Sequence, residues 1–490
     1  MSTPFDALLA YQRQSEALGR IAQLLGWDHE TVMPAGSGDD RSEQMAALAG
    51  VLHARGSGAE LGDLLSVVDP DQLAGTERRI FDLIQTDFMR RQKVPQDLAV
   101  ALARITSKSH RAWTEAKAAD DVSIFLPMLS EVVNLARQKA EVLADENTPL
   151  YDALLQDYEP DGHSAEITEI FDNLRPHLVD LRAEVLERNQ SVSLSGHFPM
   201  EQQRALTDRV ARVFGYDMDR GRIDVAVHPF SSGSGNDVRI TTRYDETNPL
   251  DSLYSTIHEV GHATYEQNVD QIYNFTPLGN GCSMAIHESQ SRIYENQLAR
   301  SRPFTDWLFS QMKDAFGDLG VLDADGFYRA VNSVKNGYIR TEADELQYNL
   351  HIMLRYDLER ALIAGDLMVN DLEAAWNDRF RADFGYAVPK ASLGMLQDIH
   401  WSECLIGYFP TYAIGNIYAA CLREAMLKDA PNAIDELAEG RTDTARTWLR
   451  ENVQQHGRRY KAQEVIEKAT GQAASSEPFV RYIREKFAEL

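Results

Sequence analysis

The sequence feature that most constrains the fold is the pentapeptide His258-Glu259-Val260-Gly261-His262. Histidines four positions apart share one face of an α-helix, so both imidazoles reach a single metal ion if this segment is helical. Glu259 then lies beside the water that such a metal activates and can take its proton. Pro249 and Asp251 are residues typical of the first turn of a helix, so they predict a helix start just before the pentapeptide. The alternative is a surface helix that carries two histidines by chance.

Two imidazoles leave a catalytic zinc site one protein ligand short, so a third ligand must come from elsewhere in the chain. The best candidate is Glu288 in the segment Ala285–Arg292, which begins a second helical pattern, and its neighbour His287 is the rival. A site made of His258, His262 and Glu288, with water in the fourth position, predicts Zn²⁺ as the cofactor. Co²⁺ or Mn²⁺ are possible substitutes, because the order of metal affinities does not settle selectivity in cells.

Charge and composition exclude several classes of partner. The 490 residues include 75 Asp and Glu against 49 Lys and Arg, a formal net charge of −26. Nucleic-acid binding requires a basic surface, so no nucleic-acid partner is expected. No window of eighteen apolar residues occurs, which predicts no membrane span, and residues 1–6 lack the pattern of a secretory signal. Three scattered cysteines (Cys282, Cys404 and Cys421) are too few for a disulfide framework, so we expect a cytoplasmic protein.

Hydrophobic periodicity predicts a mainly α-helical fold. Residues 1–200 are almost wholly helical in pattern, and the first helix is expected to end at Leu25, before an irregular segment anchored by Trp27. His29 and Glu30 in that segment are either functional or part of a buried loop. Residues 222–230 and 237–244 alternate with period two and predict a strand pair just before the metal helix. Either it pairs with an extended peptide or it only covers the core. Residues 335–364 predict one long helix.

Several motifs together resemble those of the Taq-type metallocarboxypeptidase family, and the resemblance runs over nearly the whole chain. Residues 27–31 look like the family's N-terminal pattern. The five later motifs occur in the family's order: Asp237-Val238-Arg239-Ile240-Thr241, the pentapeptide His258–His262, His287-Glu288-Ser289-Gln290-Ser291-Arg292, Ile339-Arg340-Thr341-Glu342-Ala343-Asp344, and Gly394-Met395-Leu396-Gln397-Asp398-Ile399-His400-Trp401.

The resemblance implies a large helical body with a deep central groove and a small β-sheet near the metal site. It also implies a single metallocarboxypeptidase domain over residues 1–490, with an N-terminal helical part (1–200) and a part carrying the metal site (201–490). A homodimer is expected. The implied activity is metal-dependent removal of single residues from peptides with a free C-terminus, with broad specificity. The motif positions imply His258, His262 and Glu288 as metal ligands and Glu259 as the catalytic general base.

Other residues are candidates for binding the oxyanion and the substrate. His400, Tyr408 and Tyr412 lie in loop-like sequence and are candidate hydrogen-bond donors to the oxyanion, or else core aromatics. An exopeptidase must also recognise the free α-carboxylate, and the planar fork of arginine matches it. Arg340 is the first candidate, followed by Arg292 and Arg239, and each is otherwise a structural ion-pair partner. The sequence leaves open which arginine does this, the preferred C-terminal residue and the physiological substrates.

Two other functions remain open at this point. One is a groove-type metallo-oligopeptidase that cuts internal bonds with the same zinc chemistry. The other is a catalytically silent helical peptide-binding protein. Glu259 counts against the second, because a binding module has no need of a carboxylate beside a metal's water.

Overall fold

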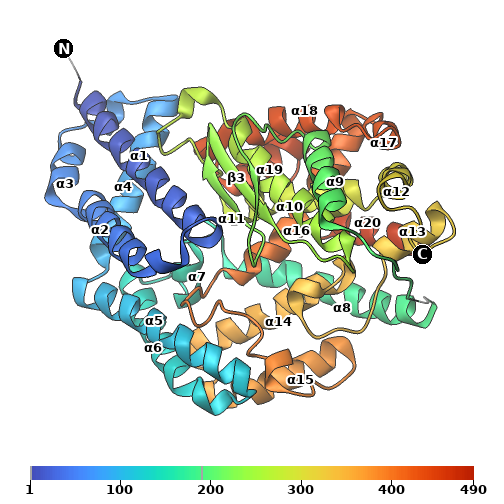
Figure 1. Ribbon diagram of the computed structural model, residues 1–490. Helices are drawn as coiled ribbons and strands as arrows, with labels where there is room; N and C mark the ends of the chain where they lie inside the picture. Colours follow the sequence, from blue (N-terminus) through green and yellow to red (C-terminus); the bar gives the residue numbers. More distant parts are fainter. Residues whose placement is uncertain (1–2, 189–190) are drawn as a thin grey trace. The chain divides into compact units, whose positions relative to one another are not determined.

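The computed structural model describes residues 3–188 and 191–490, which fold into two compact units, each built from three separate stretches of chain. Unit 1 consists of Met1–Gln92, Ser193–Val331 and Leu422–Ala473, and unit 2 of Lys93–Val192, Asn332–Cys421 and Ala474–Leu490. Most described residues are helical, as predicted, and the elements are labelled in Figure 1. That the whole chain is a single domain, with parts 1–200 and 201–490, stays a prediction.

Unit 1 is helical apart from one small sheet. Its helices are α1 (Pro4–Thr31), α2 (Gly38–Ser57), α3 (Ala59–Ser66), α4 (Gly75–Lys93), α9 (Met200–Val213), α10 (Pro249–Asn268), α11 (Met284–Arg292), α12 (Arg302–Phe316), α13 (Ala324–Val331), α17 (Ala433–Leu437), α18 (Asp443–Asn452) and α19 (Ala462–Thr470). A π-helix, η5 (Ile293–Ala299), directly continues α11. Helix α10 is the core element of this unit, because Ile257, Val260 and Ala263 have no exposed surface.

The sheet of unit 1 has the strand order β1-β3-β2, formed by β1 (Ile223–Val225), β2 (Ser231–Ser234) and β3 (Asp237–Thr242). Strand β1 pairs with β3 in parallel and β2 pairs with it antiparallel. The predicted second strand is confirmed in β3. The first prediction is wrong in detail, because only residues 223–225 of it are strand, and the antiparallel partner β2 lies between the two predicted strands. Thr242 connects β3 to the metal helix, since its hydroxyl donates to the Ser252 carbonyl (3.2 Å).

Helix α1 is longer than the sequence predicted. It runs through Gly26 to Thr31, so the prediction of a helix end at Leu25 is wrong. Trp27 is buried as expected, but on a helix face, and the Thr31 hydroxyl donates to its carbonyl oxygen (2.6 Å). His29 and Glu30 are exposed neighbours that form an ion pair of 3.9 Å.

Unit 2 contains α5 (Gln96–Ala119), α6 (Leu126–Leu143), α7 (Leu150–Leu155), α8 (Ser164–Arg188), α14 (Glu345–Ala364), α15 (Leu372–Phe384) and α20 (Glu477–Ala488), and α16 (Phe409–Asp429) begins in it. The long helix predicted from residue 335 starts only at Glu345. Asp344 caps it by accepting from the Gln347 amide (3.0 Å), which is a strong N-terminal signal. Arg340 therefore lies before this helix, in the 3₁₀ turn η6 (Arg340–Glu342).

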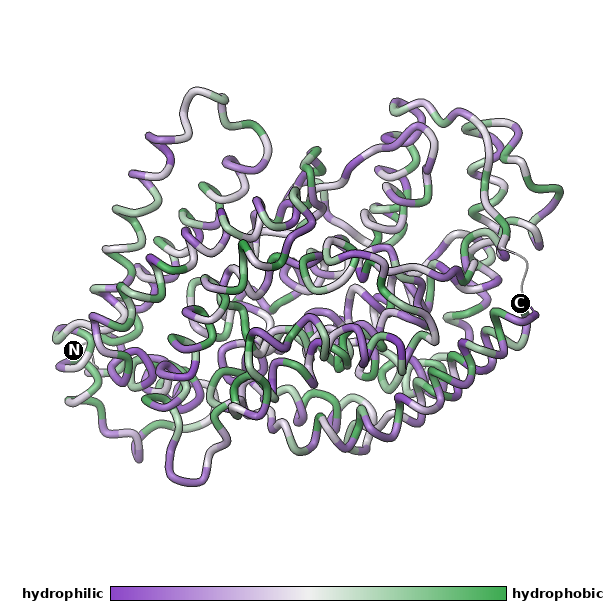
Figure 2. Tube along the Cα trace, turned by 90° about the horizontal axis from the view of Figure 1, so that it is seen from below, coloured by the Kyte–Doolittle hydropathy of each residue, from purple (hydrophilic) through white to green (hydrophobic). Residues whose placement is uncertain are grey.

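Polar and apolar residues alternate over short distances along the helices, as the purple and green segments of Figure 2 show. Between residues 3 and 188, and from 191 to 490, no helix combines the length and the apolar content needed to cross a membrane.

Candidate metal centre

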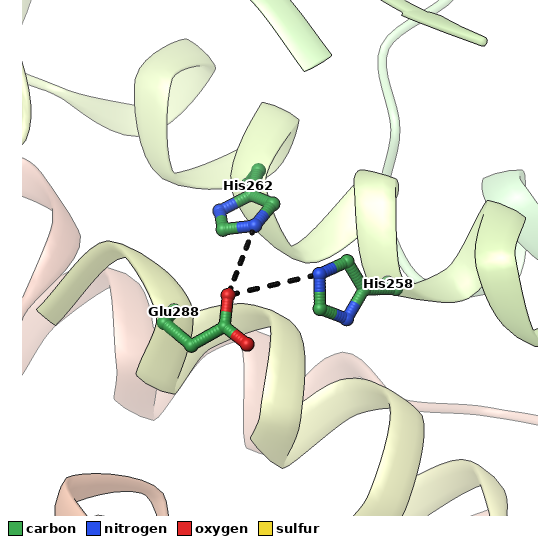
Figure 3. A group of neighbouring side chains, drawn as sticks. All are labelled: His258, His262 and Glu288. Atoms are coloured by element: carbon green, nitrogen blue, oxygen red, sulfur yellow. Dashed lines mark ion pairs between the residues drawn. The ribbon is translucent and has the colours of Figure 1, made fainter. Parts of the chain in front are cut away.

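Two neighbouring helices bring the three predicted metal ligands together. His258 and His262 project from α10, and Glu288 projects toward them from α11 (Figure 3). Glu288 Oε2 lies 3.7 Å from His258 Nε2 and 3.4 Å from His262 Nε2. The three candidate ligand atoms all lie within 4.8 Å of one another. This is the spacing that one shared cation requires, because ligand atoms about 2 Å from a metal are about 3–4 Å apart.

Gly261 allows the two helices to approach this closely. A Cβ atom at this position would lie 2.4 Å from Ser291 Cα and 2.6 Å from the Gln290 carbonyl oxygen, both backbone atoms of α11. Only glycine leaves room for that contact. The glycine inside the pentapeptide is thus part of the site, because the close approach holds Glu288 within reach of both histidines.

The outer nitrogens of both histidines have hydrogen-bond partners of their own. His258 Nδ1 lies 2.9 Å from Glu295 Oε2, and His262 Nδ1 lies 2.6 Å from His287 Nδ1. A carboxylate can only accept, so Glu295 places the proton of neutral His258 on Nδ1 and leaves the Nε2 lone pair facing Glu288. His287, the rival ligand, therefore contacts the far side of His262, and it is not part of the cluster of three.

Glu295 is a residue that the sequence analysis missed. It lies in the π-helix η5 and also accepts from Arg292 Nη1 (3.2 Å) and Arg300 Nη2 (3.3 Å). Such π-helical segments are rare and frequently occur at functional sites. A signal was present in the sequence, because Glu295 follows Glu288 by seven positions, a spacing that puts both carboxylates on one helix face.

The electrostatics favour a positive charge between the three ligands. Burial lowers the pKa of His258, but Glu288 and Glu295 outweigh burial and raise it above its ordinary value. Burial lowers the pKa of His262 to about 3, so this imidazole is neutral and keeps a lone pair. Burial opposes ionisation of Glu288, yet Arg292 and His258 hold its pKa below the usual range. Two imidazole nitrogens and a carboxylate around such a position fit a divalent cation.

Glu259 is the carboxyl group that directly follows His258 in α10. Its side chain is buried, with 7% of its surface exposed. Burial raises the pKa of Glu259 to about 7, against the opposing effect of His258. A carboxyl group that titrates near neutrality can both accept and donate a proton under physiological conditions.

The predicted oxyanion residues lie together in unit 2. His400 Nε2 lies 3.2 Å from the Tyr412 hydroxyl, and the His400 ring stacks on Phe409 at 4.3 Å. The Tyr408 and Tyr412 rings meet edge-on at 5.1 Å. Burial lowers the pKa of His400 to about 3, so the imidazole is neutral and can offer an N–H or a lone pair.

Arg340, the first candidate for the substrate carboxylate, belongs to a buried ionic cluster. Its Nε and Nη2 donate to Asp398 Oδ1 (2.9 and 2.8 Å), and its Nη1 donates to the Tyr348 hydroxyl (3.0 Å). Arg355, which has no exposed surface, donates through Nε to the other Asp398 oxygen (2.6 Å). Arg355 was missed in the sequence analysis, because a single arginine in a helix is most often a solvated surface residue.

The other two candidate arginines also have carboxylate partners. Arg292 donates through Nε to Glu288 Oε1 (2.6 Å), the oxygen that does not face the histidines. Arg239 forms a two-pronged pair with Asp237 (2.7 and 2.9 Å) and stacks on Trp27 with its guanidinium 4.2 Å from the ring centre. Arg292 therefore orients the metal-ligand candidate Glu288. Arg239, which lies in strand β3, packs on Trp27 near the C-terminal end of α1.

Comparisons with known proteins agree over nearly the full length of the chain. The family described as carboxypeptidase Taq (M32) metallopeptidase matches residues 7–487. Thermostable carboxypeptidase 1 of Thermus thermophilus is 37% identical, covering 99% of this chain and 98% of the relative. Carboxypeptidase 1 of Bacillus subtilis is 34% identical, covering 99% and 97%.

Solved structures show the same fold. The crystal structure of the M32 carboxypeptidase from Deinococcus radiodurans R1 superposes with a TM-score of 0.95 at 38% identity, covering 99% of both chains. Metallocarboxypeptidase 1 of Trypanosoma cruzi gives a TM-score of 0.97 at 31% identity, covering 99% of this chain and 100% of that one.

Proposed function

The chain belongs to the carboxypeptidase Taq (M32) metallopeptidase family, and on that premise we propose that His258, His262 and Glu288 hold its catalytic metal. Membership makes the protein a metal-dependent carboxypeptidase, a hydrolase that acts on peptides. The observation that carries the proposal is the convergence of the three ligand atoms within 4.8 Å. We propose zinc as the metal, because two imidazoles and one carboxylate are a frequent ligand set of catalytic zinc.

When bound, the metal would supply Lewis acidity, which polarises the scissile carbonyl and lowers the pKa of water. Glu259 is the proposed general base. It accepts the proton of the attacking water and then gives it to the leaving amine, as acid–base reversal requires. Its position next to His258 in the sequence and its raised pKa of about 7 support both halves of this role.

His400 and Tyr412 are the proposed donors to the oxyanion of the tetrahedral intermediate, with Tyr408 in support. The contact between His400 Nε2 and the Tyr412 hydroxyl (3.2 Å) supports a shared role, because each holds the other in place. The lowered pKa of His400 leaves it neutral, so it acts as a hydrogen-bond partner without carrying a charge. One such donor contributes about 2–4 kcal/mol to lowering the barrier.

Arg340 is the residue that we propose for recognition of the substrate α-carboxylate. Its cluster contains two guanidinium groups, Arg340 and Arg355, around the single carboxylate of Asp398. The unbalanced positive charge favours an incoming carboxylate. Arg292 and Arg239 are weaker candidates, because Arg292 already contacts two carboxylates (Glu288 and Glu295) and Arg239 forms a one-to-one pair with Asp237.

Two further parts of the proposal concern the protein as a whole. A cytoplasmic location is supported by the three cysteines, all of which are free thiols. A homodimer is proposed from the family resemblance, and sedimentation analysis of the purified protein tests it. Broad side-chain specificity is proposed on the same ground, and a panel of peptides that differ only in the last residue tests it.

The experiment that tests the function follows one short peptide in free and C-terminally amidated forms by mass spectrometry. We expect stepwise loss of single C-terminal residues from the free peptide, loss of this activity with a chelator, and its return with Zn²⁺. Equal cleavage of the amidated peptide contradicts the carboxylate-recognition role of Arg340. Internal fragments from the free peptide would indicate an oligopeptidase instead.

A further inference from the structure

A chain of short contacts runs outward from the metal-ligand candidate His262. His262 Nδ1 lies 2.6 Å from His287 Nδ1, and His287 Nε2 lies 2.9 Å from Glu266 Oε1. The same Glu266 oxygen accepts from the Gly281 amide (3.0 Å). Helix α10 thus supplies both ends of this series, and His287 of α11 lies between them.

The direction of the hydrogen bonds follows from the carboxylate. An ionised Glu266 can only accept, so a neutral His287 carries its proton on Nε2 and presents the lone pair of Nδ1 to His262. His262 must then carry its own proton on Nδ1, which leaves the Nε2 lone pair facing Glu288. The opposite direction would point a lone pair of His287 at the carboxylate and an N–H of His262 at the place of the metal.

The two histidine ligands are therefore oriented by different hydrogen-bond arrangements. His258 has a carboxylate, Glu295, directly on its Nδ1 (2.9 Å), whereas His262 reaches Glu266 only through a second imidazole. His287 also packs closely against Gly281 in the loop before α11. A Cβ atom on Gly281 would lie only 2.7 Å from His287 Cδ2. The position of His287 is thus fixed from two sides.

We propose that His287 and Glu266 are positioning residues that hold His262 in the Nδ1–H form and thereby set the affinity of the site for its cation. This inference rests on the proposed metal site. Removal of such an outer partner typically weakens metal binding by about 10–100-fold. His287 does not touch the metal in this assignment, and it acts only through His262.

The test is a Zn²⁺ competition titration with a chromogenic chelator on the full-length apo protein, with circular dichroism to check folding. We expect His287→Ala and Glu266→Ala to weaken Zn²⁺ binding by about 10–100-fold. His287→Asn places a carbonyl oxygen near the former Nδ1 and should recover most of that loss. His110→Ala is the matched control, because His110 also pairs with a glutamate (Glu403, 2.6 Å) but lies in unit 2. It should leave Zn²⁺ affinity unchanged.

A second readout does not involve metal at all. In apo protein with ¹⁵N-labelled histidine, the long-range ¹H–¹⁵N spectrum reports which ring nitrogen of His262 carries the proton, and the missing signal of His262→Ala assigns the peak. We expect the Nδ1–H form in the wild type and a mixture of tautomers in Glu266→Ala.

The outcomes separate this inference from the metal site on which it rests. If His262→Ala keeps wild-type Zn²⁺ affinity, the metal site itself is wrong, and so is the inference. If His262→Ala loses Zn²⁺ while His287→Ala and Glu266→Ala bind it as the wild type does, the site stands and the positioning role is overturned. Should His287→Ala fail to fold, Glu266→Ala decides the question by the same criterion.

Discussion

Two clusters of ionisable side chains, one in each unit, stabilise a carboxylate by different means. In unit 1, Glu288 Oε2 and the Nε2 atoms of His258 and His262 converge to within 4.8 Å of one another. In unit 2, Asp398 is held by the guanidinium groups of Arg340 and Arg355. The first group presents lone pairs and anionic charge to one place and so needs a cation from outside. The second pairs its one carboxylate with two guanidinium groups, so internal ion pairs hold it together and one positive charge is left in excess.

The arginine contacts of the two carboxylates, Glu288 and Asp398, also differ. Arg292 binds the Glu288 oxygen that faces away from the histidines, so the remaining oxygen is left for a cation. Both oxygens of Asp398 are taken by arginines. A buried charge must be paired or must bind a metal. The difference therefore indicates that ligand binding completes the unit 1 group, whereas internal ion pairs hold the unit 2 group together.

The largest effect we expect separates chemistry from binding within the unit 1 group. Glu259→Gln removes the proton acceptor but none of the three metal-ligand candidates, so kcat should fall by about 10²–10⁴-fold. Zn²⁺ content, measured by elemental analysis after gel filtration, should equal that of the wild type. Full turnover with metal retained would exclude Glu259 as the base, and loss of metal would mean that Glu259 belongs to the ligand set.

The next effect tests whether the unit 2 group depends on its internal ion pairs. Asp398→Asn leaves two buried guanidinium groups without their anion, and loss of one partner of a buried pair costs about 3–5 kcal/mol. The free energy of unfolding from urea denaturation measures this. Asp237→Asn is the matched control, because its pair with Arg239 is partly exposed (57% and 20% of the side chains) and exposed pairs contribute only about 0–1 kcal/mol. Equal losses in the two variants would contradict the comparison.

A smaller effect tests the geometry that brings the unit 1 ligands together. Alanine is normally favoured over glycine in a helix by about 1 kcal/mol. At Gly261, however, the new Cβ meets α11 backbone at 2.4 Å, and overpacking costs about 1–3 kcal/mol. Gly261→Ala should therefore lose stability and also bind Zn²⁺ more weakly, as thermal melts with and without Zn²⁺ would show.

Gly50→Ala is the control for that substitution, because Gly50 lies in helix α2 and a Cβ there would meet nothing within 4 Å. It should gain stability from helix propensity alone. If Gly261→Ala behaved like Gly50→Ala, the close approach of α10 and α11 would not be what holds the metal ligands in place.

The contrast between the unit 1 and unit 2 clusters also explains which parts of the site the sequence could predict. The contacts of His258 with His262 are local, because four residues of helix fix their spacing. Glu288 was found because it lies in the next helical pattern along the chain. By contrast, Arg340 and Asp398 are separated by 58 positions and meet only through the fold, and no local pattern marks that pairing. Helix α14 begins later than periodicity suggested because a cap, Asp344, decides its start. The three-residue strand β1 is too short for its alternation to define its ends.

The last effect is a change of stability with pH, and it concerns a buried carboxyl group of unit 2 whose hydrogen-bond donors are all neutral. Glu359 has no exposed surface and accepts from Tyr151 (2.8 Å), Trp401 (2.9 Å) and the Gly407 amide (3.0 Å). Burial outweighs these donors and raises the pKa of Glu359 from 4.5 to about 7. Between these two values the folded protein binds a proton that the unfolded chain has released. The contribution of Glu359 to stability is therefore complete below pH 4.5 and falls as the pH rises to about 7.

The slope in that window is at most about 1.4 kcal/mol per pH unit, and it is measured by urea denaturation at intervals between pH 5 and pH 7.5. Glu359→Gln carries no titrating group, so the difference in unfolding free energy between wild type and variant should change by this slope and become constant above pH 7. A difference that is independent of pH would mean that the three donors keep Glu359 ionised throughout. In that case unit 2 would hold a carboxylate stabilised by neutral donors alone, and internal ion pairing would not be the only way in which this unit buries an anion.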